Sequence, residues 1–168
     1  MVESRGSGEQ QLPHSIEAEQ AVLGGLMLTN GSFDSIASVV SEADFFANDH
    51  QLIFQTMRTL SSESKPLDVI TLSETLQNTN ELEQVGGAAY LVELANNTPS
   101  SANIGAYAQI VLERSIIRQL ITAAGDIVKK GFNPLGWDSS KLLAEAEQKL
   151  ADIIENRPKQ GGFKGVNE

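Results

Sequence analysis

Residues 103–131 read NIGAYAQIVLERSIIRQLITAAGDIVKKG, and this stretch decides the fold. It contains no proline, so it predicts one continuous helix of roughly 42 Å at 1.5 Å per residue. Gly131 is expected to end this helix, because Lys129 and Lys130 precede it and positive charge suits a helix C-terminus. The sequence NPLG at 133–136 then predicts a tight turn.

A second helix is expected over residues 139–156, with Asp138 or Ser139 as its N-terminal cap. Its apolar residues form a single stripe, which one partner helix is enough to bury. The sequence therefore predicts a helical hairpin over residues 103–157. The stripe consists of Leu142, Leu143, Ala146, Leu150, Ile153 and Ile154.

The first helix of this hairpin is apolar on two neighbouring faces. One row consists of Ile116, Leu120, Ala123 and Ile127, and the other of Ile117, Ile121, Ala124 and Val128. The second helix is only about 27 Å long and cannot cover both rows. An apolar surface left over on a hairpin is usually an interface, so we expect pairing with a second copy or with another protein. The alternative is that the second row packs against the chain's own body.

The composition excludes several classes of protein. The 168 residues are enough for one domain with a real core, since 40% of them are hydrophobic. Cysteine is absent, which fits a reducing cytosol and excludes disulfides and thiolate metal sites. No apolar run is long enough to span a membrane, and residues 1–12 lack the apolar core of a signal peptide. Residues 1–12 are expected to form a disordered arm, and residues 158–168 the start of a flexible linker.

Charge is distributed unevenly along the chain, whose net charge is −10. Residues 13–100 contain twelve acidic side chains and only two basic ones, Arg58 and Lys65. Residues 103–157 contain seven of each. Because an acidic surface repels phosphates, the first region is a poor primary binder of nucleic acid, and the neutral hairpin is better suited to contact with protein.

Residues 13–102 predict a small bundle of short helices. The first helix spans residues 13–28 with Ser15 as its cap, and a second runs from a cap at Ser32 to Val40. Gly24 and Gly25 lie inside the first helix, where each costs about 1 kcal/mol relative to Ala, so we expect another helix to cross closely there.

Further helix starts follow from local signals in the same region. Asn48 is expected to cap the third helix, and Thr71-Leu72-Ser73-Glu74 matches a capping box for the fourth. Val69-Ile70 would then be a short extended lead-in, and a fifth helix follows Gly86-Gly87. No stretch alternates over more than four residues, so strands are not expected. The predicted fold class is all-α, a small helical bundle followed by a long antiparallel helical hairpin.

The sequence contains no recognisable catalytic constellation. The motifs of nucleotide-binding loops, zinc proteases and serine hydrolases are absent. His14 and His50 both lack a partner at ligand spacing, and the many carboxylates are better explained as solvated faces, with Asp68 and Glu74 as helix caps. No catalytic, cofactor-binding or metal-binding residue is therefore predicted.

Several blocks of sequence, in the same order, resemble the N-terminal domain of bacterial replicative DNA helicases of the DnaB type. The resemblance covers residues 13–157. The blocks are PHSIEAEQAVLGG at 13–25, DVITL at 68–72, GGAAYL at 86–91 and NTPSSANI at 97–104.

The resemblance implies a scaffold rather than an enzyme. In that family the hairpins pair head to head, and six such domains form a trimer-of-dimers collar on a hexameric ring. The collar docks the C-terminal helicase-binding domain of primase and contacts the helicase loader only indirectly. ATP and Mg²⁺ belong to the motor domain that follows the linker, so this segment is expected to bind neither. DNA is engaged through the ring and not directly by this domain, and no membrane is involved.

The same resemblance implies partner-binding residues. Glu17 and Tyr90 match positions implicated in communication with primase, and Ile121 and Ile127 are candidates for contact with primase or with a second hairpin. Ile117 and Val128 share the apolar rows and complete the set. The alternatives are that Glu17 is an ordinary surface charge, that Tyr90 is a core tyrosine, and that the isoleucines are buried within the chain's own hairpin.

Two other functions were weighed. A helicase loader or the helicase-binding domain of primase would share the plan of bundle plus hairpin, but the blocks at 13–25 and 97–104 favour the helicase itself. A binder of single-stranded DNA at the ring entrance is disfavoured by the acidic bundle.

Overall fold

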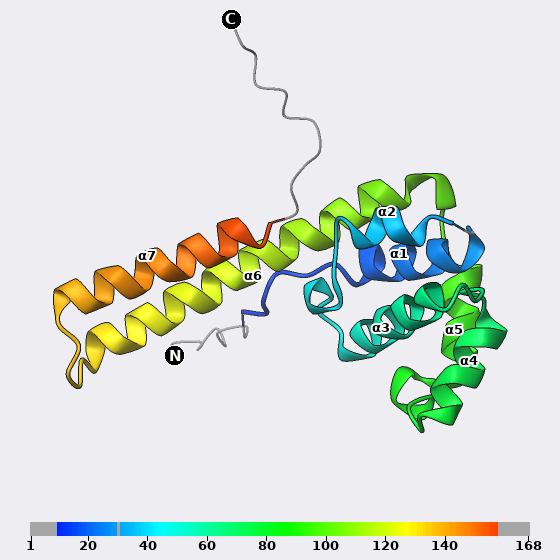
Figure 1. Ribbon diagram of the computed structural model, residues 1–168, viewed down its shortest axis with the longest axis horizontal. Helices are drawn as coiled ribbons and strands as arrows, with labels where there is room; N and C mark the ends of the chain where they lie inside the picture. The colour runs from blue at the N-terminus through cyan, green and yellow to red at the C-terminus, as the bar shows by residue number, and fades with distance from the viewer. Residues whose placement is uncertain (1–9, 30, 158–168) are drawn as a thin grey trace, which may run out of the picture.

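The computed structural model describes residues 10–29 and 31–157, so the predictions for residues 1–9 and 158–168 lie outside the described residues. Within those ranges every regular element is a helix, which confirms the all-α prediction. A bundle occupies one end of the molecule and a two-helix hairpin extends from it, as Figure 1 shows. The elements in chain order are α1 (Ile16–Leu28), α2 (Phe33–Ala37), η1 (Glu42–Asp44), α3 (Asn48–Ser62), α4 (Val69–Asn78), η2 (Glu83–Val85), α5 (Gly87–Asn96), η3 (Ser101–Asn103), α6 (Ile104–Phe132) and α7 (Ser139–Glu155).

Helix α1 lies at the centre of the bundle, where α3, α5 and α6 pack against it. Ser15 caps it as predicted, because the Ser15 hydroxyl accepts a hydrogen bond from the backbone N–H of Ala18 at 3.2 Å. Most of its side chains are buried, as expected for a helix that is apolar on nearly every face. The core around it includes Leu23, Phe45, Ile53, Phe54, Leu72, Leu76 and Leu91, none of which has exposed surface.

Gly24 and Gly25 mark the close crossing that the sequence predicts. A Cβ atom at Gly24 would lie 2.2 Å from the carbonyl oxygen of Leu94, and one at Gly25 would lie 2.5 Å from the side chain of Ile104. Both distances are far shorter than a van der Waals contact. The end of α5 and the start of α6 therefore approach α1 at a distance that only glycine permits.

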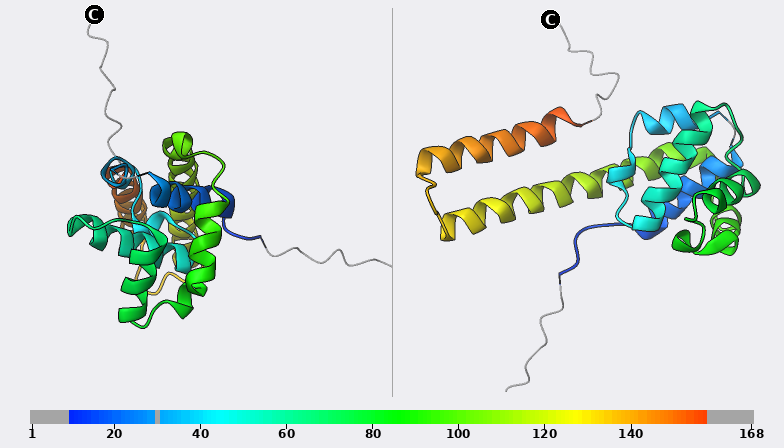
Figure 2. Two further views of the ribbon diagram at one scale, coloured as in Figure 1. Left: turned by 90° about the vertical axis from the view of Figure 1, so that its right-hand side faces the viewer. Right: turned by 60° about the horizontal axis from the view of Figure 1, so that its bottom comes forward.

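Helix α6 belongs to both parts of the molecule. Ile104, Ala108 and Val111, near its N-terminus, are buried in the bundle core, whereas its C-terminal half pairs with α7. Figure 2 shows the same helix entering the bundle at one end and forming the hairpin at the other. The bundle and the hairpin are thus joined by one continuous helix and not by a flexible connection.

Helix α7 runs antiparallel to the second half of α6. Lys149 and Asp126 form an ion pair across the two helices at 3.3 Å, and Lys130 forms another with Glu145. Asp138 caps α7 as predicted, because its carboxylate accepts a hydrogen bond from the backbone N–H of Lys141 at 2.9 Å.

The prediction that Gly131 ends α6 is wrong, because the helix continues through Phe132. The turn predicted at 133–136 is confirmed, and Gly136 within it has a φ of +80°, in the left-handed region that glycine adopts at little cost. The second helix is also shorter than predicted, since α2 ends at Ala37 and not at Val40.

The capping box predicted at Thr71 is wrong as well. Asp68 is the cap of α4, because its carboxylate accepts a hydrogen bond from the backbone N–H of Thr71 at 2.9 Å. Val69 and Ile70 are therefore helical and not an extended lead-in. The interpretation of Asp68 as a helix cap is thereby confirmed.

Asn48 does not cap α3, since it is already the first helical residue and Ala47 takes the cap position. Ala47 has no polar side chain to accept the first N–H groups of the helix. The carboxylate of Asp49 accepts the backbone N–H of His50 at 2.8 Å, and Glu19 of α1 accepts the N–H of Ala47 itself at 3.3 Å.

We expect the substitution Gly24→Ala to destabilise the bundle by about 1–3 kcal/mol, because the added methyl overlaps the α5 backbone. The matched control is Gly125→Ala in α6, where a Cβ atom meets nothing within 4 Å outside its own helix backbone. That change should stabilise by roughly 0.5–1 kcal/mol. Urea denaturation at one protein concentration measures both, and equal stabilities for the two variants would contradict the close crossing.

Candidate functional site

The hairpin exposes apolar side chains on both of its helices. On α6, Ile121 and Val128 are 45% and 55% exposed, and Leu120 and Ala124 are exposed as well. On α7, the exposed apolar residues are Leu143, Leu150 and Ile154. The second row of α6 is therefore left largely uncovered within one chain.

These exposed residues share one side of the hairpin. Counted at about 100° per residue from Ala123, which is buried, the exposed row of α6 is turned to one side. Counted from Lys149, which pairs with Asp126 of α6, the exposed row of α7 is turned by a similar amount in the same rotational sense. Because the helices are antiparallel, equal rotations in one sense bring both rows to the same side. We call this surface the apolar hairpin face, and it comprises Ile117, Leu120, Ile121, Ala124, Val128, Leu143, Leu150 and Ile154.

The apolar hairpin face points away from the bundle. The residues by which α6 enters the core, Ala108 and Val111, lie on the opposite side of the helix by the same count. Ile117 is half-buried rather than fully exposed. Ile127 is also half-buried, on the side of α6 that turns toward α7.

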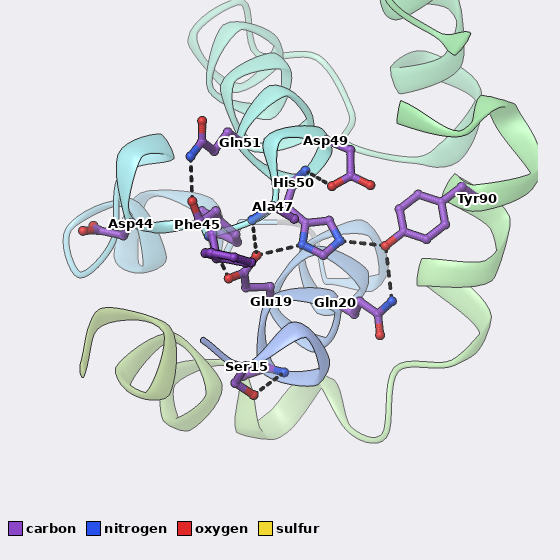
Figure 3. A network of polar contacts seen from close by, with 12 residues as sticks. Ser15, Glu19, Gln20, Asp44, Phe45, Ala47, Asp49, His50, Gln51 and Tyr90 are labelled. Atoms are coloured by element: carbon purple, nitrogen blue, oxygen red, sulfur yellow. Dashed lines mark hydrogen bonds and ion pairs between the residues drawn. The ribbon is translucent and has the colours of Figure 1, made fainter. Parts of the chain in front are cut away.

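A second notable group is a buried polar network inside the bundle, drawn in Figure 3. The Nδ1 atom of His50 lies 2.8 Å from a carboxylate oxygen of Glu19, and its Nε2 atom lies 2.6 Å from the hydroxyl of Tyr90. The side-chain amide of Gln20 also donates to that hydroxyl, at 3.2 Å. Only about 1% of the surface of Glu19 and of His50 is exposed. Three elements, α1, α3 and α5, are therefore joined by one network.

The Glu19 carboxylate has three hydrogen-bond donors. Besides His50, the backbone N–H groups of Phe46 and Ala47 donate to it, at 2.8 and 3.3 Å. Both amides precede α3, so the negative charge lies at the positive end of that helix's dipole. A buried carboxylate requires such partners, because an unpaired one would be very costly.

The network is consistent with one arrangement of protons. If Nδ1 of His50 donates to Glu19, Nε2 can accept a hydrogen bond from the hydroxyl of Tyr90, and every member is satisfied. The order carboxylate, imidazole, hydroxyl also occurs in nucleophilic triads. Here, however, burial raises the pKa of Tyr90, which disfavours the phenolate that such chemistry would need. What the contacts themselves do is tie α1, α3 and α5 together.

The residues predicted as partner contacts fall into two separate groups. Glu17 is exposed on α1, where with Gln20 and Glu93 it lines a small cleft of about 190 Å³ between α1 and α5. Tyr90 lies one turn before Glu93 on α5 and is half-buried. Glu17 and Tyr90 thus lie on one side of the bundle. Ile117, Ile121 and Val128 form part of the apolar hairpin face, and Ile127 lies beside it.

Sequence reasoning missed the roles of Glu19, His50 and Arg118. Glu19 lies in the first turn of α1, but it is buried and accepts hydrogen bonds from the backbone just before α3. The one available signal was that Glu19 lies at helical spacing from apolar residues of α1, three positions after Ile16 and three before Val22. Among residues 10–29 and 31–157, no group of three or more His, Asp or Glu side chains could hold a metal ion. In the same ranges no helix has both the length and the apolar character needed to cross a membrane.

Comparison with known proteins gives a consistent result. A family model described as the DnaB-like helicase N terminal domain matches residues 11–113. The replicative DNA helicase DnaB of Buchnera aphidicola subsp. Baizongia pistaciae is 48% identical over 159 residues, which is 94% of this chain and 34% of that protein. DnaB of Haemophilus influenzae is 47% identical over 145 residues, covering 86% of this chain and 31% of that protein. The chain thus spans about a third of the length of the curated relatives it matches.

Solved structures match as well. The N-terminal domain of DnaB helicase from Mycobacterium tuberculosis has a TM-score of 0.80 at 31% identity, covering 84% of this chain and 99% of that one. A DnaB-like replicative helicase, whose structure was solved together with a study of its interactions with primase, has a TM-score of 0.68 at 26% identity. That match covers 83% of this chain and 31% of the other. The chain belongs to the family of DnaB-like helicase N-terminal domains.

Proposed function

We propose that this chain is the collar domain of a hexameric replicative helicase and that it assembles through its hairpin. The observation that carries the proposal is the apolar hairpin face, which combines residues of two helices and faces away from the bundle. A contiguous apolar surface of this kind favours burial against another protein. A second copy fits best, because a symmetric pair requires a single surface that complements itself.

In such a helicase, nucleotide binding and DNA contact would belong to parts of the protein other than this domain. ATP and Mg²⁺ would be bound by a motor domain, and this segment would neither bind nor hydrolyse ATP. DNA would be engaged through the assembled ring in the bacterial cytoplasm, and a helicase loader would act on this domain only indirectly. The acidic residues of the bundle support that division, because they disfavour contact with phosphates.

We further propose that the bundle recruits primase through the side formed by α1 and α5. The support is the DnaB-like helicase of known structure that was studied with primase, together with the position of Glu17 and Tyr90 on one side of the bundle. A helicase loader or a helicase-binding domain of primase was the alternative, but the relatives that match most of this chain are replicative helicases.

We expect Ile121→Asp and Val128→Asp to weaken self-association at least tenfold, because burying each of these side chains contributes about 1.5–3 kcal/mol. Light scattering coupled to size-exclusion chromatography should show the wild-type chain at twice its mass of 18.1 kDa or more, and the variants shifted toward the monomer. Ile70→Asp is the matched control, since Ile70 is exposed on α4 and outside the hairpin.

Two outcomes would refute the hairpin interface. One is a wild-type chain that remains monomeric at high concentration. The other is a loss of helical circular dichroism in the Ile121→Asp variant, since that would show the side chain to be part of the chain's own core.

For primase we expect Glu17→Lys to reduce binding several-fold, because reversing a charge at the rim of an interface mainly slows association. Glu74→Lys on α4 makes the same charge change away from the α1–α5 side and should bind as the wild type does. Surface plasmon resonance with immobilised primase compares the two. Equal association rates for both variants would remove Glu17 from the proposed contact.

A further inference from the structure

The hairpin and the bundle are separated by open space on two sides of their junction. One cleft of about 470 Å³ lies between Ala43, Phe45 and Phe46 of the bundle and Lys149, Asp152 and Ile153 of α7. Another, of about 540 Å³, lies between residues 37–44 of the bundle and Gln119 and Asn156 of the hairpin. Apolar packing of α6 in the core is dense only as far as Val111. Beyond that point the hairpin extends from the bundle as a lever, as Figure 2 shows.

A polar contact joins the two parts at the edge of these clefts. The hydroxyl of Ser115 donates to the carboxylate of Asp44 at 2.7 Å, and the guanidinium of Arg118 donates to the backbone carbonyl of Asp44 at 2.6 Å. Ser115 is only 3% exposed, although it lies on the part of α6 that extends beyond the apolar core of the bundle. This is the place where the hairpin leaves the bundle.

Arg118 makes two more contacts from the same position. Its guanidinium donates to the carbonyl of Pro13 at 2.8 Å and lies 5.5 Å from the centre of the Phe46 ring. The Phe46 ring in turn stacks on His14, with centroids 4.1 Å apart. A planar group with several donors can bind two carbonyls and a ring at once, which lysine cannot do. Three segments distant in the sequence therefore meet at one side chain.

Arg118 contacts one side of the turn at residues 44–47, and the buried network holds the other side of that turn. Glu19 accepts the N–H groups of Phe46 and Ala47, while the side-chain amide of Gln51 donates to the carbonyl of Phe45 at 2.7 Å. His50 and Tyr90 hold the Glu19 carboxylate in place (Figure 3). The turn at residues 44–47 cannot shift without leaving buried polar groups unpaired. It is therefore a rigid contact point for the hairpin.

We propose that residues 44–47, gripped between Arg118 and Glu19, form a lock that sets the angle between hairpin and bundle. The lock would also set the spacing of the two bundles once hairpins pair, and that consequence rests on the function proposed above. Apolar contacts alone are poorly directional, whereas these hydrogen bonds specify one geometry. Arg118 is thus a positioning residue for assembly and not part of the pairing surface.

The test measures one distance within a single chain. Because the chain has no cysteine, Gln77→Cys on α4 and Ala144→Cys on α7 allow two spin labels to be attached at exposed positions. The labelled chain is diluted into an excess of unlabelled chain, so that only distances within one chain are recorded. Double electron–electron resonance should give one narrow distribution for the wild type and a broader one for Arg118→Gln.

Three further variants make the result specific. Arg118→Lys keeps the charge but not the planar group and should also broaden the distribution. Glu19→Gln should do so from the other side of the turn, with faster hydrogen exchange at the amides of Phe46 and Ala47. Arg114→Gln is the control, because Arg114 lies one turn earlier on α6 and forms no hydrogen bond to a described residue; it should leave the distribution unchanged. Circular dichroism shows that each variant is folded.

A distribution as narrow in Arg118→Gln and Arg118→Lys as in the wild type would overturn the lock. Equal broadening in Arg114→Gln would overturn it too, because the effect would then come from loss of any charge on α6. Neither result depends on pairing, since the distance is measured within one chain. A monomeric wild type with a narrow distribution that broadens in the Arg118 variants would refute the proposed function and leave the lock standing.

Discussion

The constraint on which the rest of the structure depends is that a single uninterrupted helix belongs to both halves of the molecule. The first turns of α6 complete the bundle core through Ile104, Ala108 and Val111, and its last turns are half of the hairpin. The bundle must therefore accept α6 at close range, which is why Gly25 of α1 lies against Ile104. The direction of the hairpin is set by how the start of α6 packs in the core, because α6 contains no proline at which it could bend.

A buried carboxylate provides the second organising interaction. Glu19 of α1 accepts the N–H groups of Phe46 and Ala47, just before α3, and is held by His50 and through it by Tyr90. A local cap would stabilise α3 alone, whereas this arrangement makes the start of α3 dependent on the positions of α1 and α5. Breaking such a group is costly, since each lost partner leaves a buried donor or acceptor unsatisfied. The network therefore contributes specificity to a bundle whose apolar contacts could tolerate several packings.

The sequence predicted what depends on local pattern. The hairpin, the caps at Ser15 and Asp138 and the close crossing at Gly24 all follow from residues near one another in the chain. What it missed depends on contacts across the chain. His50 was set aside because no partner lies near it in sequence, yet Glu19 lies 2.8 Å away in space. Arg118 gave no signal of its own, because nothing near it in the sequence indicated that Pro13 and Asp44 would meet it.

In the assembly and the lock proposed above, affinity and direction would come from different residues on opposite sides of α6. The apolar hairpin face can attract a partner, but an apolar surface fixes geometry poorly because the hydrophobic effect is not directional. Ser115 and Arg118 face the bundle and add the missing direction through hydrogen bonds to Asp44. Separating the two roles lets the pairing surface vary without changing the angle at which the bundle is carried. In a ring assembled from copies of one chain, a small error in the angle between hairpin and bundle would recur at every subunit. The polar contact of Ser115 and Arg118 with Asp44, where the hairpin leaves the bundle, is therefore where a fixed geometry matters most.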